Sequence, residues 1–115
     1  LSIKTESVQI PIRNLSGGNQ QKAVIAKWLH ADARILLMSE PTAGIDVAAK
    51  TEVNQFIKQI ASEGKGLLYT SSYISELMEV ADRILVIYQG RIFREFVREA
   101  YEHNKIYLAI NGIKQ

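Results

Sequence analysis

A short segment before the first predicted helix combines small and polar residues that could bind an anion. Ser16 offers a hydroxyl group, while Gly17 and Gly18 would let a ligand approach the backbone closely. The periodic pattern from Asn19 onward predicts a helix, whose first N–H groups lack intrahelical partners and lie at the positive end of the dipole. The alternative is that Ser16 only caps the helix and the glycines form a turn. On these features alone, the capping interpretation is the stronger one.

Two acidic residues follow the next apolar run of the sequence. The run at 35–38 predicts a strand buried on both faces, and Pro41 begins a loop. Glu40 would then be a carboxylate at the end of a strand, where an ordinary solvated role is the simple alternative. Asp46 directly precedes a predicted helix at 47–62, so its side chain could serve merely as a helix cap.

Helices and strands alternate along the chain and would position these residues. Gly64 falls where glycine commonly ends a helix, Gln89 and Gly90 predict a hairpin turn, and the tail from Arg98 is compatible with a helix. The alternation favours an α/β class with a small parallel sheet of about three strands, whose open edge suggests a missing half. Helices are predicted at 19–30, 47–62 and 74–81, and strands at 35–38, 67–70, 84–88 and 91–97.

Composition excludes several classes of protein. The 115 residues allow one domain at most, with 47% hydrophobic and 23% charged residues, as in an ordinary globular protein. No apolar run reaches the roughly 18 residues of a membrane span, and the first ten residues do not resemble a signal peptide. The lack of cysteine excludes disulfides and thiolate metal sites and fits a cytosolic protein. A net charge of +2 does not favour nucleic acid, because glutamates dilute the arginines at 91–98.

The remaining candidate side chains do not predict a site. His30 ends a predicted helix and His103 lies in a polar tail; neither has a partner pattern, so no metal site is assigned. Trp28 and the tyrosines are predicted to be core or interface residues rather than a nucleotide-stacking group.

Three motifs, taken with their order and spacing, resemble those of ABC-type ATPases. Residues 15–20 (LSGGNQ) match the signature motif, in which Asn19 and Gln20 follow the glycines. Residues 35–42 (ILLMSEPT), about twenty positions later, resemble a Walker B strand followed by its catalytic glutamate. Residues 43–46 (AGID) stand where the family has its D-loop. The detailed form is most similar to importers of ribose, galactose or xylose type.

The resemblance implies a chemistry shared between two cassettes. Such cassettes face each other head to tail with ATP and Mg²⁺ between them, and the phosphate loop of one binds the nucleotide. The signature of the other, here Ser16, Gly17 and Gly18, would close on the γ-phosphate. Glu40 would be the catalytic residue that polarises the attacking water. Asp46 would contact the opposite cassette and help to couple the two sites.

The family's phosphate-binding loop does not occur in this chain. The single Gly-Lys pair, Gly64-Lys65, has Gln59 at the position of the first glycine and Gly66 at the position of the Ser or Thr. Without that loop nothing cradles the α- and β-phosphates, so we expect this chain alone to be inactive. The resemblance therefore implies a partial P-loop NTPase fold without its N-terminal phosphate-loop half.

Two serines also depart from the family pattern. Ser39 stands where the Walker B aspartate is expected, so a neutral hydroxyl replaces a charge that helps to hold magnesium. Ser72, counted back from Asp82, falls at the position of the switch histidine of many ABC ATPases. Because related second cassettes of sugar importers often carry serine there, Ser72 is the less damaging change.

The resemblance also implies a domain organisation and a set of partners. Residues 1–31 would be the signature-helix part of a helical subdomain, 32–97 the α/β core and 98–115 a C-terminal tail of one cassette, the second of its protein. Partners would be the N-terminal half or a second cassette, the membrane permease subunits and, indirectly, a sugar-binding protein, but no nucleic acid. The location would be cytoplasmic, on the inner face of the cell membrane.

Three interpretations of the chain stay open on sequence alone. It could be part of an enzyme that powers carbohydrate import, from a disrupted or partly sequenced gene. It could be a degenerate, non-catalytic half that lends its signature loop to a partner's ATP. It could also be a structural or regulatory domain that reuses the fold. A start at Leu1 rather than methionine favours the first.

Overall fold

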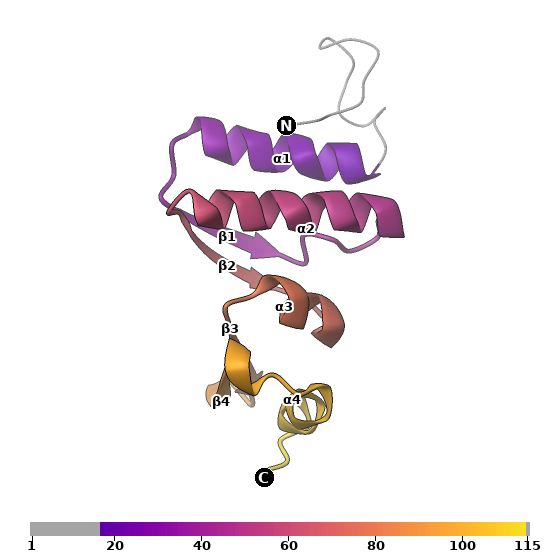
Figure 1. Ribbon diagram of the computed structural model, residues 1–115, viewed down its shortest axis with the longest axis vertical. Helices are drawn as coiled ribbons and strands as arrows, with labels where there is room; N and C mark the ends of the chain where they lie inside the picture. The colour runs from indigo at the N-terminus through magenta and orange to yellow at the C-terminus, as the bar shows by residue number, and fades with distance from the viewer. Residues whose placement is uncertain (1–16, 115) are drawn as a thin grey trace. The chain divides into compact units, whose positions relative to one another are not determined.

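The computed structural model describes residues 17–114, and the chain divides into two compact units, residues 1–71 and 72–115. Figure 1 shows the two helices of the first unit side by side on one side of its two strands. Both helices run in one direction and both strands in the other. The elements of this unit are α1 (Gly17–His30), β1 (Ile35–Ser39), α2 (Val47–Ser62) and β2 (Gly66–Thr70).

Strands β1 and β2 form a parallel pair, with α2 as the crossover between them. Leu36 lies opposite Leu67, and Ser39 lies opposite Thr70 at the carboxyl ends of the strands. Parallel pairing requires a connection of this kind, because a tight hairpin would reverse the strand direction. The two carboxyl ends therefore meet at the same end of the unit.

Helix α2 confirms the predicted amphipathic segment and its bounds. Val53, Ile57 and Ile60 recur at helical spacing and are at most 2% exposed, so they form the core of the unit together with Leu36. The helix ends before Gly64, whose φ of +92° is in the left-handed region that glycine adopts without strain. Gly64 therefore ends this helix as predicted.

The prediction that the strand at 35–38 is buried on both faces is wrong. Leu36 is buried, but Ile35 and Leu37 are 69% and 75% exposed. Both helices cover the same side of the β1–β2 pair (Figure 1), so the alternate side chains of β1 have no cover within the described residues. The apolar run indicates a strand that needs cover on both faces, but residues 17–114 cover one face of β1 only.

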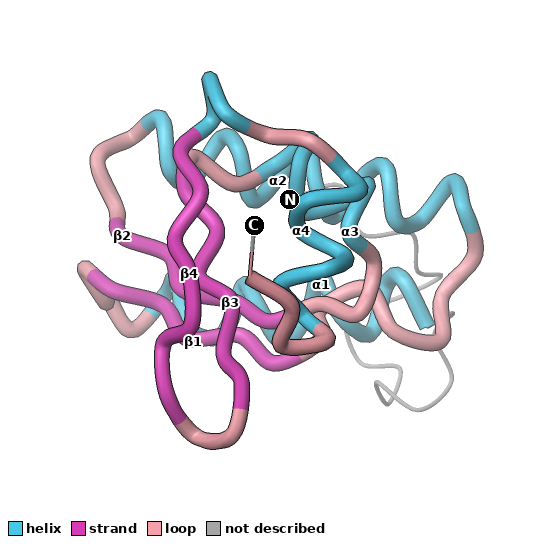
Figure 2. Tube along the Cα trace, turned by 90° about the horizontal axis from the view of Figure 1, so that it is seen from below, coloured by secondary structure: helices cyan, strands magenta, loops and turns pink. Residues whose placement is uncertain are grey.

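The second unit is built around a hairpin. Figure 2 shows the two strands of this hairpin and the loop that joins them. Gln89 and Gly90 form a two-residue turn with φ values of 50° and 77°, as in the turns that match the twist of paired strands. The elements are α3 (Ile74–Val80), β3 (Arg83–Tyr88), β4 (Arg91–Val97), the 3₁₀ turn η2 (Arg98–Ala100) and α4 (His103–Ile110).

The expected parallel sheet of about three strands is not found: among the described residues β1 pairs in parallel with β2, and β3 pairs antiparallel with β4 across the predicted hairpin turn. The described residues form two sheets of two strands each. Ile84 and Val86 of β3 are buried while Leu85 and Ile87 are exposed. Such alternation is typical of an antiparallel strand with one covered face. It could not be seen in the sequence, because the residues of β3 on both faces are apolar.

The core of the second unit joins the hairpin to α3 and α4. Arg98 and Tyr101 both donate hydrogen bonds of 2.8 Å to the carbonyl oxygen of Ala81, just after α3. Burial raises the pKa of the Tyr101 phenol, and the Arg98 charge opposes this shift.

The tail that follows is helical in α4, as the sequence allows. The buried core residues are Ile74, Ile84, Val86, Phe96, Ile106 and Ala109.

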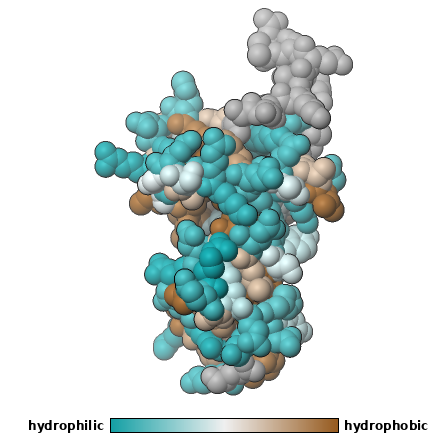
Figure 3. Space-filling model, viewed as in Figure 1, coloured by the Kyte–Doolittle hydropathy of each residue, from teal (hydrophilic) through white to brown (hydrophobic). Residues whose placement is uncertain are grey.

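The surface is mixed in character. On the face shown in Figure 3, hydrophilic side chains cover most of the surface and hydrophobic ones are scattered among them. Between residues 17 and 114, no helix is both long and apolar enough to cross a membrane.

Candidate functional site

One end of the first unit gathers most of the candidate residues. The N-terminal ends of α1 and α2 and the carboxyl ends of β1 and β2 lie at this end (Figure 1). It carries Gly17 and Gly18 at the start of α1, Ser39 at the end of β1, Glu40 directly after β1, and Asp46 before α2. We call these five residues the site edge. In open α/β sheets, ligands bind outside the carboxyl ends of the strands, so this is the expected place for a site.

Glu40 has an unusual backbone conformation, with a φ of 47°. Its N–H donates to the Thr70 carbonyl oxygen at 3.1 Å and approaches the Thr70 Oγ1 at 3.2 Å, so the end of β2 holds it in place. A non-glycine residue in this region costs on the order of 1–3 kcal/mol, and such residues cluster at functional sites. The side chain is half-buried. These hydrogen bonds hold the backbone of Glu40 in place at the carboxyl end of β1.

Ser39 is exposed and adds only a neutral hydroxyl beside Glu40. Within the described part of the chain, no three His, Cys, Asp or Glu side chains are grouped so that they could hold a metal ion. Magnesium is usually held by one or two carboxylates together with water and nucleotide phosphates. Ser39 and Glu40 therefore do not fit a magnesium ion by themselves, and the ion would require phosphate oxygens from a nucleotide.

A tight loop leads from Glu40 to α2. The Ala43 N–H donates to the Glu40 carbonyl oxygen at 3.1 Å, and Gly44 has a φ of +73°. At the end of the loop, Asp46 Oδ1 accepts a 2.8 Å hydrogen bond from the Ala49 N–H. Asp46 is therefore the N-cap of α2, as the capping alternative predicts. Its side chain is also exposed at the site edge, so capping is compatible with a contact to another protein.

Helix α1 begins at Gly17, and its first turn contains no acidic residue. The positive end of the α1 dipole is therefore not neutralised by a carboxylate of that turn. Asn19 and Gln20 are half-buried. Ser16 lies outside the described residues, so its predicted cap or ligand contact stays a prediction. The anion-binding role predicted for this helix start likewise stays a prediction.

Lys22 is a residue that the sequence analysis missed. It is 5% exposed, and its Nζ donates to Glu52 Oε2 on α2. A lysine is almost never buried unless it is paired. The available signal was its position three residues before Ile25 and seven before Leu29, on the apolar stripe of the predicted helix.

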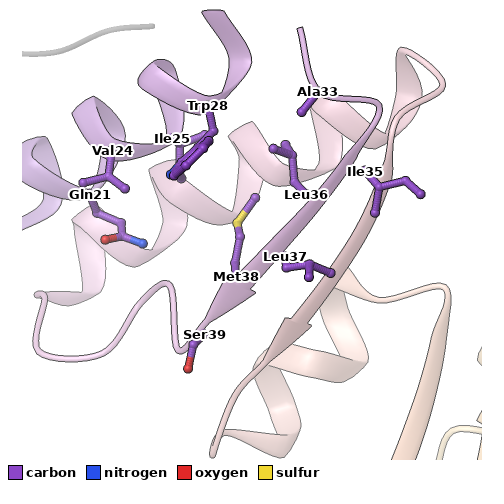
Figure 4. Close-up of a pocket in the computed structure, with 10 residues that line it drawn as sticks. All are labelled: Gln21, Val24, Ile25, Trp28, Ala33, Ile35, Leu36, Leu37, Met38 and Ser39. Carbon is purple, nitrogen blue, oxygen red and sulfur yellow. The ribbon is translucent and has the colours of Figure 1, made fainter. Parts of the chain in front are cut away.

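A groove of about 520 Å³ lies between α1 and β1 and ends at Ser39. Figure 4 shows Leu36 and Met38 pointing from β1 toward the helices, with Trp28 above Met38. Trp28 is half-exposed along this groove, which is consistent with an interface residue rather than a core residue. The lining is mainly apolar, with Gln21 and Ser39 as its polar side chains.

Ser72 and the two histidines lie apart from the site edge in the chain. Ser72 is an exposed residue of the second unit, shortly before α3. Its switch role toward Glu40 of the first unit stays a prediction. His30 and His103 are exposed, and neither belongs to a group of three or more potential metal ligands among residues 17–114.

Comparison with curated proteins finds relatives among sugar-import ATP-binding proteins, although no family model matches the chain. It is 46% identical over 112 residues to the ribose import ATP-binding protein RbsA of Oceanobacillus iheyensis. It is 44% identical over 113 residues to the xylose import ATP-binding protein XylG of Thermoanaerobacter pseudethanolicus. These alignments cover 97% of this chain in both cases, but 23% and 22% of the relatives. The chain thus spans less than a quarter of their length.

Solved structures with the same fold are ATP-binding cassettes. A dimeric cassette, MJ0796, bound to ADP and Pi matches with a TM-score of 0.72 and 24% identity, over 86% of this chain and 43% of that one. An inward-facing ABC transporter of metal-chelate type matches with a TM-score of 0.77 and 20% identity, over 88% and 41%. The chain therefore has the mixed α/β fold of part of an ATP-binding cassette and is homologous to a part of the ATP-binding proteins of sugar importers.

Proposed function

We propose that this chain is the C-terminal part of the second ATP-binding cassette of a carbohydrate importer. In this role it supplies the signature loop, the catalytic glutamate and the D-loop. The observation that carries the proposal is the convergence of α1's glycine start, Glu40 and Asp46 at the site edge. The homology to ribose- and xylose-import proteins supports it.

Four of the five residues of the site edge have a role in this proposal. Gly17 and Gly18, with Ser16, present backbone N–H groups to the γ-phosphate of ATP bound by a facing cassette. Glu40 polarises the attacking water, and its constrained backbone supports that use. Asp46 contacts the facing cassette while it caps α2. The nucleotide with Mg²⁺ supplies the transferable phosphoryl group and the charge that activates it.

The proposed organisation follows one cassette. Residues 1–31 belong to a helical subdomain, 32–97 to the α/β core with Ser72 at the switch position, and 98–115 to a tail. The partners are the phosphate-loop half, a facing cassette and the membrane permease subunits, which receive sugar from a binding protein. The assembly acts at the cytoplasmic face of the membrane. ATP and Mg²⁺ bind only in that assembly, because this chain lacks the phosphate loop.

The test is a whole cassette made by joining this chain to the preceding portion of a ribose-import relative. Gly18→Asp places a carboxylate where the γ-phosphate would approach, so it should abolish hydrolysis at the site shared with the facing cassette. Gly66→Asp is the matched control. Gly66 is not in the left-handed region, its Cβ would make only an ordinary contact with Ile35, and it lies at the start of β2, at the opposite end of the strand from the site edge. Unchanged turnover in Gly18→Asp would refute the role of this loop.

A non-catalytic cassette half is the second candidate, favoured by the neutral Ser39 beside Glu40. Such a half would lend its glycines to the facing cassette and perform no chemistry at its own site. The variant Glu40→Gln separates the two functions in the same joined cassette. If Gly18→Asp abolishes ATP hydrolysis while Glu40→Gln leaves the rate of ATP hydrolysis unchanged, the chain acts as a binding module and not as an enzyme.

A further inference from the structure

The ion pair between Lys22 and Glu52 connects the two parallel helices of the first unit across 30 residues of sequence. The Lys22 side chain is 6% exposed and that of Glu52 is 50% exposed. An ammonium group taken out of water loses its hydration, and only a well-placed partner offsets that cost. Lys22 is the buried half of this pair, so its contact with Glu52 contributes to holding it in place.

The pair lies close to both helix starts. Lys22 is four residues after Gly18, about one helical turn, and Glu52 is six residues after the cap Asp46, under two turns. Because α1 and α2 run in the same direction with their N-terminal ends together (Figure 1), the pair lies just behind the site edge.

Apolar contacts between these helices are less directional. Ile25 of α1 and Val53 of α2 are buried, but apolar contacts follow area and tolerate sliding or rotation of one helix on another. A charged hydrogen bond requires a donor and an acceptor at defined places, and buried polar pairs of this kind are known to fix register.

We propose that Lys22 is a positioning residue that sets the start of α1 relative to the start of α2 through its ion pair with Glu52. Its importance for ATP hydrolysis rests on the proposed function, in which Gly17 and Gly18 must stand at a fixed place relative to Asp46. The pair binds no ligand. It holds the signature glycines and the D-loop at one spacing.

The experiment measures that spacing in the 115-residue chain by electron spin resonance. The chain has no cysteine, so Lys27→Cys on α1 and Ala48→Cys on α2 provide two exposed sites for spin labels. We expect one narrow distance distribution for the otherwise unchanged chain. Lys22→Met and Glu52→Gln should each broaden this distance distribution. Lys22→Arg should keep it narrow, and so should the exchanged pair, Lys22→Glu with Glu52→Lys.

Asp32→Asn is the matched control, because it removes a carboxylate 4.0 Å from another lysine, Lys65, in the same unit. It should leave the distribution unchanged. Circular dichroism checks that each variant keeps its helices. Should Lys22→Met fail to fold, Glu52→Gln still tests the pair, because Glu52 is half-exposed and Gln preserves its shape. An unchanged distribution in Glu52→Gln would overturn the proposal.

A second measurement separates this inference from the proposed function. In the joined cassette, Glu52→Gln should lower kcat without raising the KM for ATP, since the facing cassette's phosphate loop binds the nucleotide, and the exchanged pair should recover kcat. A changed distance with unchanged kcat would leave the positioning role standing and refute the proposed use of the glycine loop.

Discussion

Replacing Gly112 by alanine should destabilise the second unit more than the same change at Gly90. Gly112 follows α4 with a φ of +76°, and its N–H donates to the Ala109 carbonyl oxygen at 2.9 Å. A Cβ atom there would lie 2.5 Å from Cζ of Tyr88, which is closer than carbon atoms approach. Gly90 has nearly the same φ, +77°, but its Cβ would meet nothing within 4 Å.

The expected magnitude follows from these two environments. An alanine at positive φ costs about 1 kcal/mol relative to glycine, and both variants carry this cost. At Gly112 the Tyr88 ring must also move, which disturbs its contact with Phe93 at a centroid distance of 5.8 Å. Aromatic pairs of this kind contribute about 0.5–1.5 kcal/mol. We therefore expect a loss of about 1 kcal/mol for Gly90→Ala and about 1.5–2.5 kcal/mol for Gly112→Ala.

Urea unfolding followed by circular dichroism measures both free energies of unfolding. The double variant Tyr88→Leu with Gly112→Ala is the decisive control, because a smaller side chain removes the clash. The effect of Gly112→Ala should then fall to that of Gly90→Ala. Equal losses for the two single variants in the native background would refute the argument that the Tyr88 ring packs on Gly112.

Three further predictions concern binding, association and catalysis. The chain alone should not bind Mg-ATP tightly, because it has no phosphate loop; a dissociation constant in the low micromolar range by calorimetry, about −8 kcal/mol, would contradict this. Leu37→Lys should reduce self-association in sedimentation, because Leu37 is 75% exposed on the uncovered face of β1, whereas Val47→Lys adds the same charge at an 80% exposed position and should not. If both variants sediment alike, that face does not drive association. In the joined cassette, Ser39→Asp should raise turnover roughly a hundredfold and lower the magnesium requirement, while Ser39→Asp with Glu40→Gln stays inactive. Identical curves of rate against magnesium for the serine and aspartate forms would show that Ser39 does not limit the site.

The helices and turns of this protein follow from local sequence. The apolar spacing of Val53, Ile57 and Ile60 predicts α2, and Gly64 predicts where it ends, because helical hydrogen bonds and caps join residues four or fewer positions apart. Gln89 and Gly90 predict the hairpin turn for the same reason. The candidate residues of the site edge also come from sequence, since the motif order alone singles out Gly17, Gly18, Glu40 and Asp46.

Strand burial and buried charges were decided by tertiary structure. The hairpin turn predicts that β3 pairs with β4, but the continuous apolar run of β3 does not show that only one of its faces is covered. The buried Lys22 contacts Glu52, 30 residues away, and no local pattern specifies that meeting. The left-handed φ of Glu40 likewise depends on its hydrogen bond to Thr70 at the end of the other strand. Sequence thus determined the elements and the chemistry available at their ends, whereas long-range packing decided how those ends meet.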